Sequence, residues 1–514
     1  MPQVDRSAPV AALLAVLPLA ASACSGPHAL ERRPEPDVLL QGELPADYSQ
    51  RTDATSMPDA GDDRPFWESF GDATLQALVE ESLERNHDLT ASAARVRGAL
   101  AQSSIARSAR ALQLDASGQF ARNRNVFVGL PIPGSDVVKS TFSQWDAGLN
   151  LSWELDLWGR LASQVNAADA EFEATYADLQ GARLSVAAQV AAAWFGLREA
   201  DQQLDLARAT LETWTRSLSV VRARNDAGLV GALDVRLAES NVATSRAQLV
   251  TAERGRATAS RQLEILLGRY PGAELEAAGS FEVALPPVPM GVPAELLERR
   301  PDVYAAERRL ASAEAAAKAA RLDRWPSFAL TASAGRTSSE LDDLLDGDFT
   351  IWALASRVVA PILDGGRRIA AIDESLANLR AAQATFAGTA LRSFLEVENA
   401  LDAERLLGQR ITHLEDAVAA AAEATRLADA QYVEGLVAID LVLDSQRAEL
   451  AARSTLIAAR REVYQARVDL HVALGGSFDP RLVSGAAPEL PELTAAEDEP
   501  ASGAAAGDGG AAQP

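Results

Sequence analysis

The 514-residue sequence predicts an α+β membrane protein that is built from two internal structural repeats. Three observations lead to this prediction. Long Ala-rich segments place Leu and Val at helical spacing, shorter segments alternate apolar and polar residues, and the two halves of the chain correspond to each other. We therefore expect long helices, one β-hairpin in each half, and a duplicated unit.

The duplication is clearest at Gly228 and Gly435, which lie 435 − 228 = 207 residues apart and are each followed by Leu-Val. Both glycines interrupt strongly helical patterns. Each predicts a turn between antiparallel helices, in which Gly supplies the left-handed stop and an aspartate stands near the start of the return helix. These aspartates are Asp234 and Asp440, whose offset of 440 − 234 = 206 indicates a one-residue slip.

The offset is larger upstream of the turns, since Arg107 corresponds to Arg321 at 321 − 107 = 214. The second copy has therefore lost about seven residues, 214 − 207. The loss falls in the interval that holds the strand-like sequence. We expect it to mark an exposed loop tip, where changes of length are tolerated.

The domain organisation that we predict has six segments. They are a signal peptide (1–23), a lipid-anchored tether (24–63), repeat 1 (64–268, with a β-hairpin near 112–157 and a helical tip near 225–234), an inter-repeat linker (269–292), repeat 2 (293–480, with a hairpin near 327–360 and a tip near 432–440), and a disordered tail (481–514). The tether is rich in Pro, Asp and Gly, and the tail ends in Ala and Gly, which favours disorder.

The amino terminus has the form of a secretory signal. Residues 10–21 form an apolar core that is too short for a membrane-spanning helix, and small residues then precede Cys24, the single cysteine of the chain. The segment resembles a bacterial lipoprotein signal, in which Cys24 becomes the acylated first residue and carries a fatty acid such as palmitate. The alternative is an ordinary signal with an incidental cysteine.

The charge balance disfavours nucleic-acid binding. The chain carries 48 Lys and Arg against 72 Asp and Glu, a formal charge of −24, and no basic cluster longer than Arg-Arg. No stretch after the leader approaches the ~18 consecutive apolar residues of a spanning helix. If the protein crosses a membrane, we expect β-strands to do so.

Helical patterns occupy 75–112, 161–224 and 235–267, and they recur in the second copy. A single helix over 161–224 would be ~95 Å long at 1.5 Å per residue, which exceeds the size of one globular domain. Helices of this length usually pack side by side as coiled coils. The helical pattern alone leaves open a rod-like stalk.

The alternating segments argue against a stalk. Residues 112–120 alternate apolar and polar with a period of two, and the alternation returns at 145–157. The apolar face of this second segment carries Trp145, Ala147, Leu149, Leu151, Trp153, Leu155 and Leu157. Glu154 and Asp156 belong to the opposite, polar face. Frequent acids are unfavourable in a globular core, but they suit the lumen of a membrane barrel.

Residues 328–334 repeat the alternation in the second copy, and residues 349–359 close its hairpin with a less regular pattern, which gives four strands per chain. Four strands cannot close a transmembrane barrel, because the smallest barrels have ~8 strands and an open edge in lipid leaves backbone groups unpaired. Oligomerisation is therefore required. A dimer would give about 8 strands and a trimer about 12, and only the latter leaves an appreciable lumen.

The sequence resembles the TolC-type outer-membrane efflux factors, specifically the lipoprotein branch that serves resistance-nodulation-division pumps. The matching motifs are Phe66-Trp67 with Phe70 and Asp72, Asn86-His87-Asp88-Leu89, SWELDLWGR at 152–160, VPAELLERRPD at 292–302, LDGGR at 363–367 and LDSQR at 443–447. They extend over roughly residues 60–480. The resemblance implies a homotrimer, in which a 12-stranded outer-membrane β-barrel continues into a 12-helix periplasmic α-barrel.

The resemblance also implies partners and site residues. In this family the helical tips meet a periplasmic adaptor protein, which joins the duct to an inner-membrane pump. Carried over by motif, the adaptor-binding tips are Gly228, Leu229, Val230, Gly435, Leu436 and Val437.

The family's gate segment assigns a periplasmic constriction to Asp440, Asp444 and Arg447, which at spacings of four and three residues share one helical stripe. With the one-residue slip, Asp444 and Arg447 correspond to Ala238 and Asn241, so only the second copy carries the charged pair. The alternative is an ordinary exposed ion pair, which contributes ~0 to 1 kcal/mol.

The sequence shows no metal-ligand spacing, no phosphate loop and no nucleophile signature, so we expect neither an enzyme nor a cofactor. The leading interpretation is a passive exit duct for small molecules such as drugs. It would lie in the outer membrane of a Gram-negative bacterium, lipid-anchored, and extend into the periplasm. Heavy-metal ions or a secreted polypeptide are alternative cargoes. From a different class, the alternative is a surface-anchored coiled-coil stalk that conducts nothing.

Overall fold

A computed structural model describes residues 65–127, 138–277, 279, 281, 297, 299–345, 347–476 and 478. The chain divides into two compact units, Met1–Glu43 and Leu44–Pro514, and every described residue belongs to the second unit. The predicted signal peptide (1–23), tether (24–63) and tail (481–514) therefore lie outside the described residues.

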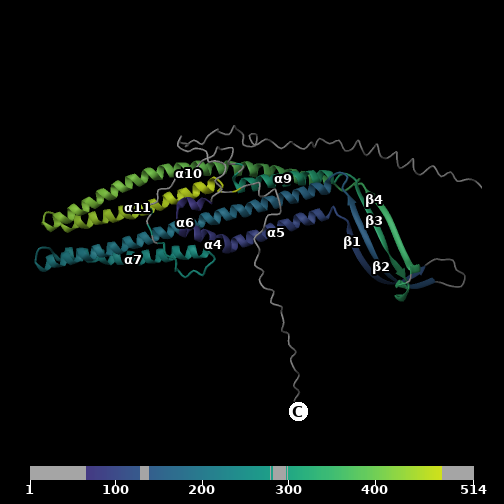
Figure 1. Ribbon diagram of the computed structural model, residues 1–514, viewed down its shortest axis with the longest axis horizontal. Coiled ribbons are helices and arrows are strands. Elements are labelled where there is room, and N and C mark those ends of the chain that lie inside the picture. The colour runs from purple at the N-terminus through teal and green to yellow at the C-terminus, as the bar shows by residue number, and fades with distance from the viewer. Residues whose placement is uncertain are drawn as a thin grey trace, which may run out of the picture. The chain divides into compact units, whose positions relative to one another are not determined.

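Long helices and one four-stranded sheet make up the described part of the second unit (Figure 1). In chain order the elements are η2 (Phe66–Phe70), α4 (Ala73–Arg85), α5 (His87–Ser108), β1 (Gln113–Phe127), β2 (Val138–Leu155), α6 (Arg160–Asp226), α7 (Ala232–Leu266), α9 (Pro301–Leu322), β3 (Ser327–Ser338), η3 (Asp342–Leu345), η4 (Gly347–Phe349), β4 (Thr350–Val359), α10 (Arg367–Val433) and α11 (Ile439–Ala473). Neighbouring strands are antiparallel, so all four strands meet their helices at one end of the sheet.

The helices confirm the predicted duplication. The two members of each corresponding pair have the same length: α5 and α9 have 22 residues, α6 and α10 have 67, and α7 and α11 have 35. In the part of the chain that the structure describes, no helix has an apolar stretch long enough to cross a membrane.

The predicted one-residue slip after the glycine turns is wrong. Helix α7 begins at Ala232 and α11 at Ile439, so the offset of 439 − 232 = 207 equals that of the glycines. The two turns have equal lengths. Asp234 and Asp440 are therefore not at equivalent positions, although both lie in the first turn of a helix. At this offset Asp440 corresponds to Leu233, and Asp444 and Arg447 correspond to Leu237 and Ser240 rather than to Ala238 and Asn241.

The seven missing residues are not lost from a loop tip, contrary to the expectation from the sequence. The segments between paired strands have 137 − 127 = 10 residues in the first hairpin and 349 − 338 = 11 in the second. The strands differ instead, with 15 and 18 residues in the first copy against 12 and 10 in the second. The sheet is therefore longer on the β1–β2 side.

The predicted helix over 75–112 is divided at Asn86 into α4 and α5. The Asn86 side-chain oxygen accepts hydrogen bonds from the backbone N–H groups of Asp88 (2.9 Å) and Leu89 (3.2 Å), which caps α5. Its amide donates to the carbonyl of Leu266 at 3.1 Å. This one side chain thus begins α5 and holds it against the end of α7.

The hydrogen-bonded register sorts the strand residues into two faces. One row across the sheet consists of Leu114, Leu151, Ala332 and Leu354. The adjacent row consists of Asp115, Asn150, Ser333 and Ala353. Because directly paired residues share a face, the apolar side chains of the four strands lie together, as predicted. Trp145, Leu149 and Trp153 belong to this apolar face.

The strand order β1-β2-β3-β4 leaves β1 and β4 with one partner strand each. Their outer edges carry backbone N–H and C=O groups that have no strand partner among the described residues. Such edges readily pair with a strand of another chain. The sheet therefore has the form of a segment that is completed by further copies.

Asp156 is not a polar-face residue of a strand, because β2 ends at Leu155. Its carboxylate accepts hydrogen bonds from the backbone N–H groups of Leu161 (3.1 Å) and Ala162 (2.7 Å), at the first turn of α6. Glu154 forms an ion pair with Arg160 at 2.7 Å. Asp156 therefore serves the strand-to-helix connection, whereas Glu154 keeps its predicted place on the polar face of β2.

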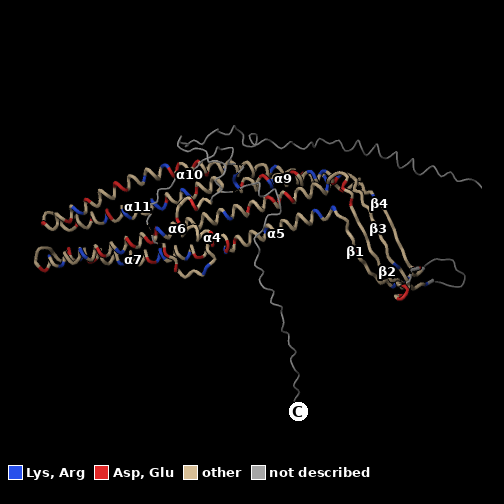
Figure 2. Tube along the Cα trace, viewed as in Figure 1, with Lys and Arg blue, Asp and Glu red and all other residues tan. Residues whose placement is uncertain are grey.

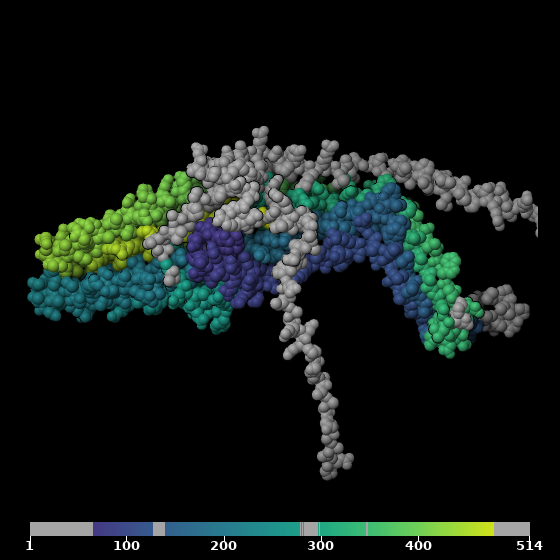
Figure 3. Space-filling model, in the orientation of Figure 1, coloured from purple at the N-terminus to yellow at the C-terminus, as the bar shows by residue number. Residues whose placement is uncertain are grey.

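The start of the described chain lies against the middle of the helices (Figure 3), where a cluster of aromatic side chains holds it. Phe66 and Phe70 of η2 are buried, with the Phe70 ring centroid 5.2 Å from that of Phe195 and the Phe66 centroid 5.5 Å from that of His471. Asp72 then caps α4 and forms an ion pair with Arg198 at 2.7 Å. This core joins η2 to α6 and α11.

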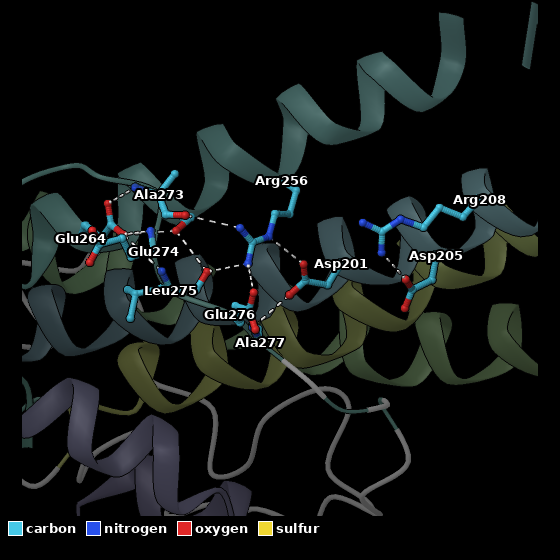
Figure 4. A network of polar contacts seen from close by, with 11 residues as sticks. Asp201, Asp205, Arg208, Arg256, Glu264, Ala273, Glu274, Leu275, Glu276 and Ala277 are labelled. Atoms are coloured by element: carbon cyan, nitrogen blue, oxygen red, sulfur yellow. Dashed lines mark hydrogen bonds and ion pairs between the residues drawn. The ribbon is translucent and has the colours of Figure 1, made fainter. Parts of the chain in front are cut away.

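The first part of the predicted inter-repeat linker is held against α6 and α7 by a polar network (Figure 4). The buried Glu264 carboxylate accepts backbone hydrogen bonds from Ala273 (2.8 Å), Glu274 (2.7 Å) and Leu275 (3.3 Å). Burial acts to raise the pKa of Glu264, but these three donors outweigh it and hold the pKa below its usual value. Arg256 donates to the Leu275 carbonyl at 2.9 Å.

The two sheet faces predict an asymmetric response to arginine. If the apolar face contacts lipid, Leu151→Arg should cost ~2 to 4 kcal/mol near the bilayer midplane, whereas the adjacent Asn150→Arg should be tolerated. The measurement is the yield of assembled protein in membranes, with Asn150→Arg as the matched control. Equal losses in the two variants would show that the face assignment is wrong.

His471 predicts a pH-dependent stability. Burial against η2 and the nearby Arg467 lower the pKa of His471 from 6.5 to about 4. The unfolded chain therefore takes up the proton first on acidification, and about 3 kcal/mol of stability is lost as the pH falls from 6.5 to 4. Denaturant unfolding of the parent and of His471→Phe at several pH values measures this. Parallel pH profiles would contradict the prediction.

Candidate functional site

The two turns that reverse the long helices, at Gly228 and Gly435, form the candidate site at one end of the helices (Figure 1). Both glycines have left-handed backbone angles, φ 71° and φ 77°. In each turn the N–H groups of the glycine and of the following leucine bond back to the helix, with Leu229 N–H donating to the Arg224 carbonyl and Leu436 N–H donating to the Gln431 carbonyl. The predicted glycine stops are confirmed.

The six predicted tip residues divide into two kinds. Leu229 and Leu436, at the outer ends, expose 67% and 70% of their surfaces. Val230 and Val437 are half-buried and pack against a cluster that draws on both turns. Among these six residues, the leucines and the exposed glycines are therefore the ones available to another protein.

This tip cluster joins the two copies. Its buried residues are Trp214, Leu218, Val221, Ala238, Val242, Ala428, Tyr432, Ile439, Val442 and Leu443. They come from α6, α7, α10 and α11, so the two helical hairpins pack against each other next to their turns. The apolar contact favours the closed pairing of the hairpins.

Arg224 links the first hairpin to the second. Its guanidinium donates to the Tyr432 backbone carbonyl at 2.7 Å and lies over the Tyr432 ring, 4.5 Å from the centroid. Burial raises the pKa of Tyr432. At the offset of 207, Arg224 corresponds to Gln431, so the clamp exists in one direction only. This contact was not predicted from the sequence, and the signal that could have found it is the arginine in one copy against Gln431 in the other.

Polar atoms without partners gather near the tips. Buried side-chain atoms that have no hydrogen-bond partner among the described residues include Arg224 Nε, Asn241 Nδ2, Ser245 Oγ, Thr425 Oγ1, Tyr432 Oη and Gln446 Oε1. Each such atom reduces the net stability of the packing that buries it. Separation of the hairpins would return these atoms to water, which lowers the cost of opening at this end.

The predicted gate residues lie on one exposed stripe of α11. Asp440, Asp444 and Arg447 are exposed, whereas Ile439 and Leu443 on the neighbouring side of the helix are buried. Arg447 forms an ion pair with Asp444. The structure thus brings the three side chains to one surface of the helix.

A groove of about 620 Å³ lies between α6, α7 and α11. Arg447 lines it, together with Asn241 and Ser245, whose polar atoms are unpartnered. The groove therefore places polar groups of the first copy beside the charged stripe of the second.

Two other expectations concern ligands. Cys24 lies outside the described residues. Among the residues that the structure describes, no group of three or more His, Cys, Asp and Glu side chains could hold a metal ion.

The chain is similar to known efflux proteins. The family described as "Outer membrane efflux protein" matches residues 78–269 and 292–476. The "Probable efflux pump outer membrane protein SepC" of Pseudomonas putida is 33% identical over 467 residues, which cover 90% of this chain and 96% of that protein. "Outer membrane protein OprJ" of Pseudomonas aeruginosa is 33% identical over 417 residues, 80% of this chain and 86% of OprJ.

Solved structures agree with these matches. The open state of the MtrE outer membrane channel of Neisseria gonorrhoeae is similar with a TM-score of 0.75 and 29% sequence identity. The similarity covers 85% of this chain and 96% of the MtrE chain.

The Arg224 clamp predicts the local stability of the tips. Arg224→Ala removes a charge-assisted hydrogen bond and a cation–π contact, together worth about 2 kcal/mol. Backbone hydrogen exchange at residues 225–231 and 432–438 should accelerate about 30-fold. Arg216→Ala is the matched control, because Arg216 on the same helix pairs only with exposed Glu212. Unchanged exchange in Arg224→Ala would exclude the clamp.

Proposed function

The chain belongs to the outer membrane efflux protein family, and we propose that it is the outer-membrane channel of a tripartite efflux system. In this role it is a passive exit duct for small molecules such as drugs. The resemblance drawn from the sequence motifs is confirmed by the family match and by the relatives.

The open four-stranded sheet carries this proposal. Its fold is that of trimeric outer-membrane channels, and three copies supply about 12 strands, which suffice to close a barrel with a lumen. The outer edges of β1 and β4 find partners on closure, and the apolar face is directed to lipid. The four long helices of each chain, α6, α7, α10 and α11, supply the 12 helices of the periplasmic duct.

The exposed leucines of the turns support a protein contact at the tips. Leu229 and Leu436 are large, apolar and solvent-exposed, and they occupy matching positions in both copies. A periplasmic adaptor protein that meets the tips, with an inner-membrane pump of the resistance-nodulation-division class behind it, would cover them. The half-buried Val230 and Val437 support the tips from inside.

Asp440, Asp444 and Arg447 form the proposed constriction. Threefold repetition brings six carboxylates toward one axis, and at ~6 Å in water each pair repels by ~0.7 kcal/mol. Arg447 offsets this repulsion through its ion pair with Asp444. The unpartnered buried atoms near the tips favour separation of the helical hairpins. The free-energy difference between the closed and the open tips is therefore small enough for adaptor contact to overcome.

The proposed cargo is inferred from the duct rather than from a binding site. Relatives are named as toluene and antibiotic efflux proteins, which favours small organic molecules over metal ions or polypeptides. We assign no catalytic role to any residue. A non-conducting stalk is disfavoured by the open sheet, which has no use in a rod.

Planar-bilayer recording tests the function. Purified protein should form discrete ion-conducting channels in the absence of any other protein. A preparation that inserts in the bilayer as a trimer without conducting would contradict the proposal and favour the stalk.

The gate residues predict a change in conductance. Asp444→Ala combined with Arg447→Ala removes the charged pair from the constriction, so single-channel conductance should rise and cells should become sensitive to large antibiotics. Asp234→Ala is the control, since it removes a carboxylate from the first turn of α7. If the double variant conducts like the parent protein, the gate lies elsewhere.

Cys24 predicts lipid attachment. Acylation adds ~0.8 kcal/mol of membrane affinity per buried methylene, but a closed barrel already anchors the protein. Cys24→Ala should therefore abolish fatty-acid labelling while trimers still form. Labelling that persists in this variant would exclude Cys24 as the attachment site.

A further inference from the structure

Exposed apolar side chains mark all four connections between strands and helices. The connections are residues 109–112, 156–159, 323–326 and 360–366. Their exposed large apolar residues are Leu112, Leu157, Trp158, Trp325, Ile362 and Leu363. Ile362 and Leu363 expose 95% and 94% of their surfaces. An apolar residue at every connection indicates a shared environment that is not water.

These four connections (109–112, 156–159, 323–326 and 360–366) form one collar, which is linked by contacts among the connections and with the flanking residues Trp153 of β2 and Arg368 of α10. The Trp153 indole donates to the Arg110 carbonyl at 3.1 Å, and the Trp158 indole donates to the Pro326 carbonyl at 2.8 Å. Arg368 then donates to the Asp323 carbonyl at 2.9 Å. The collar therefore runs without a break across the end of the sheet.

The aromatic part of the collar lies at the end of the apolar face. The Trp158 ring centroid is 5.2 Å from that of Trp325 and 6.4 Å from that of Phe328. Phe328 is paired with Leu155 and Val358 in the apolar row. Tryptophans in such a position are typical of the boundary between hydrocarbon and water, because the ring is apolar and its N–H is polar.

The collar also carries unpaired positive charge. Its acids are engaged, with Asp156 bonded to the first turn of α6 and with Asp323 and Asp364 paired to Arg368. Arg110, Arg324 and Arg367 have no acidic partner among the described residues. Figure 2 shows Lys and Arg at the helix ends from which the strands begin. This surplus contrasts with the chain's formal charge of −24.

We propose that the collar binds the head groups of anionic phospholipids in the leaflet that borders the helices. The apolar side chains enter the hydrocarbon, the indoles lie at the boundary, and the three arginines contact phosphate oxygens, which guanidinium groups bind in bidentate geometry. The inference rests on the proposed membrane barrel. It adds a lipid preference that the duct function does not require.

Lipid titration tests the site. Detergent-solubilised trimers of the full chain are titrated with phosphatidylglycerol and with phosphatidylcholine, and native mass spectrometry gives the bound fractions. The parent protein should prefer phosphatidylglycerol. The triple variant Arg110→Gln, Arg324→Gln, Arg367→Gln should bind phosphatidylglycerol at least about fivefold more weakly, with phosphatidylcholine unchanged. Free glycerol phosphate should not compete, because it lacks the acyl chains.

A matched variant controls for the loss of charge itself. Arg183→Gln, Arg254→Gln and Arg380→Gln remove three arginines from α6, α7 and α10, far along the chain from the connections. This variant should retain the preference for phosphatidylglycerol. An equal loss in both triple variants would overturn the proposal, since the effect would then follow total charge.

Conductance of the same preparation separates this inference from the proposed function. A parent protein that conducts but shows no preference for phosphatidylglycerol overturns the lipid site alone. A parent protein that prefers phosphatidylglycerol without conducting overturns the duct and supports the collar.

Discussion

The two open edges of the four-stranded sheet are the constraint on which the rest of the structure depends. In one chain, the outer edges of β1 and β4 each present a row of backbone N–H and C=O groups with no strand partner in the part of the chain that the structure describes. In hydrocarbon each unpaired group costs several kcal/mol, and lipid offers no hydrogen bonds in exchange. A single chain therefore cannot be stable in the membrane, and association of copies is part of the fold rather than an addition to it.

The duplicated helices meet this constraint by delivering four strands to one place. Helix pairs of equal length place the single β-hairpin of each repeat at the same end of the helices. The two hairpins therefore pair through β2 and β3, which lie more than 150 residues apart in the sequence, as between Leu151 and Ala332 (332 − 151 = 181). The charged residues of the candidate site occur where the two copies differ in sequence. Arg224, Asp444 and Arg447 have no charged equivalent of the same kind in the other copy, and all three lie toward the tips.

Features set by local sequence could be predicted, and features set by distant partners could not. The glycine turns, the long helices and the two strand faces follow from periodicities within the segment itself. The contact between Asn86 and Leu266 joins residues 180 positions apart, and the Arg224 clamp depends on Tyr432. Asp156 continues the polar alternation of β2 by one residue. The alternation therefore could not predict that its carboxylate bonds to the start of α6. Cys24 stays a prediction.

Hydrogen–deuterium exchange of the edge strands in lipid nanodiscs tests the central claim most directly. Closure between copies predicts that the backbone N–H groups of β1 and β4 are protected as strongly as those of β2 and β3, which already have partners on both sides. Rapid exchange along β1 and β4, with slow exchange confined to β2 and β3, would contradict a closed barrel and the duct that depends on it.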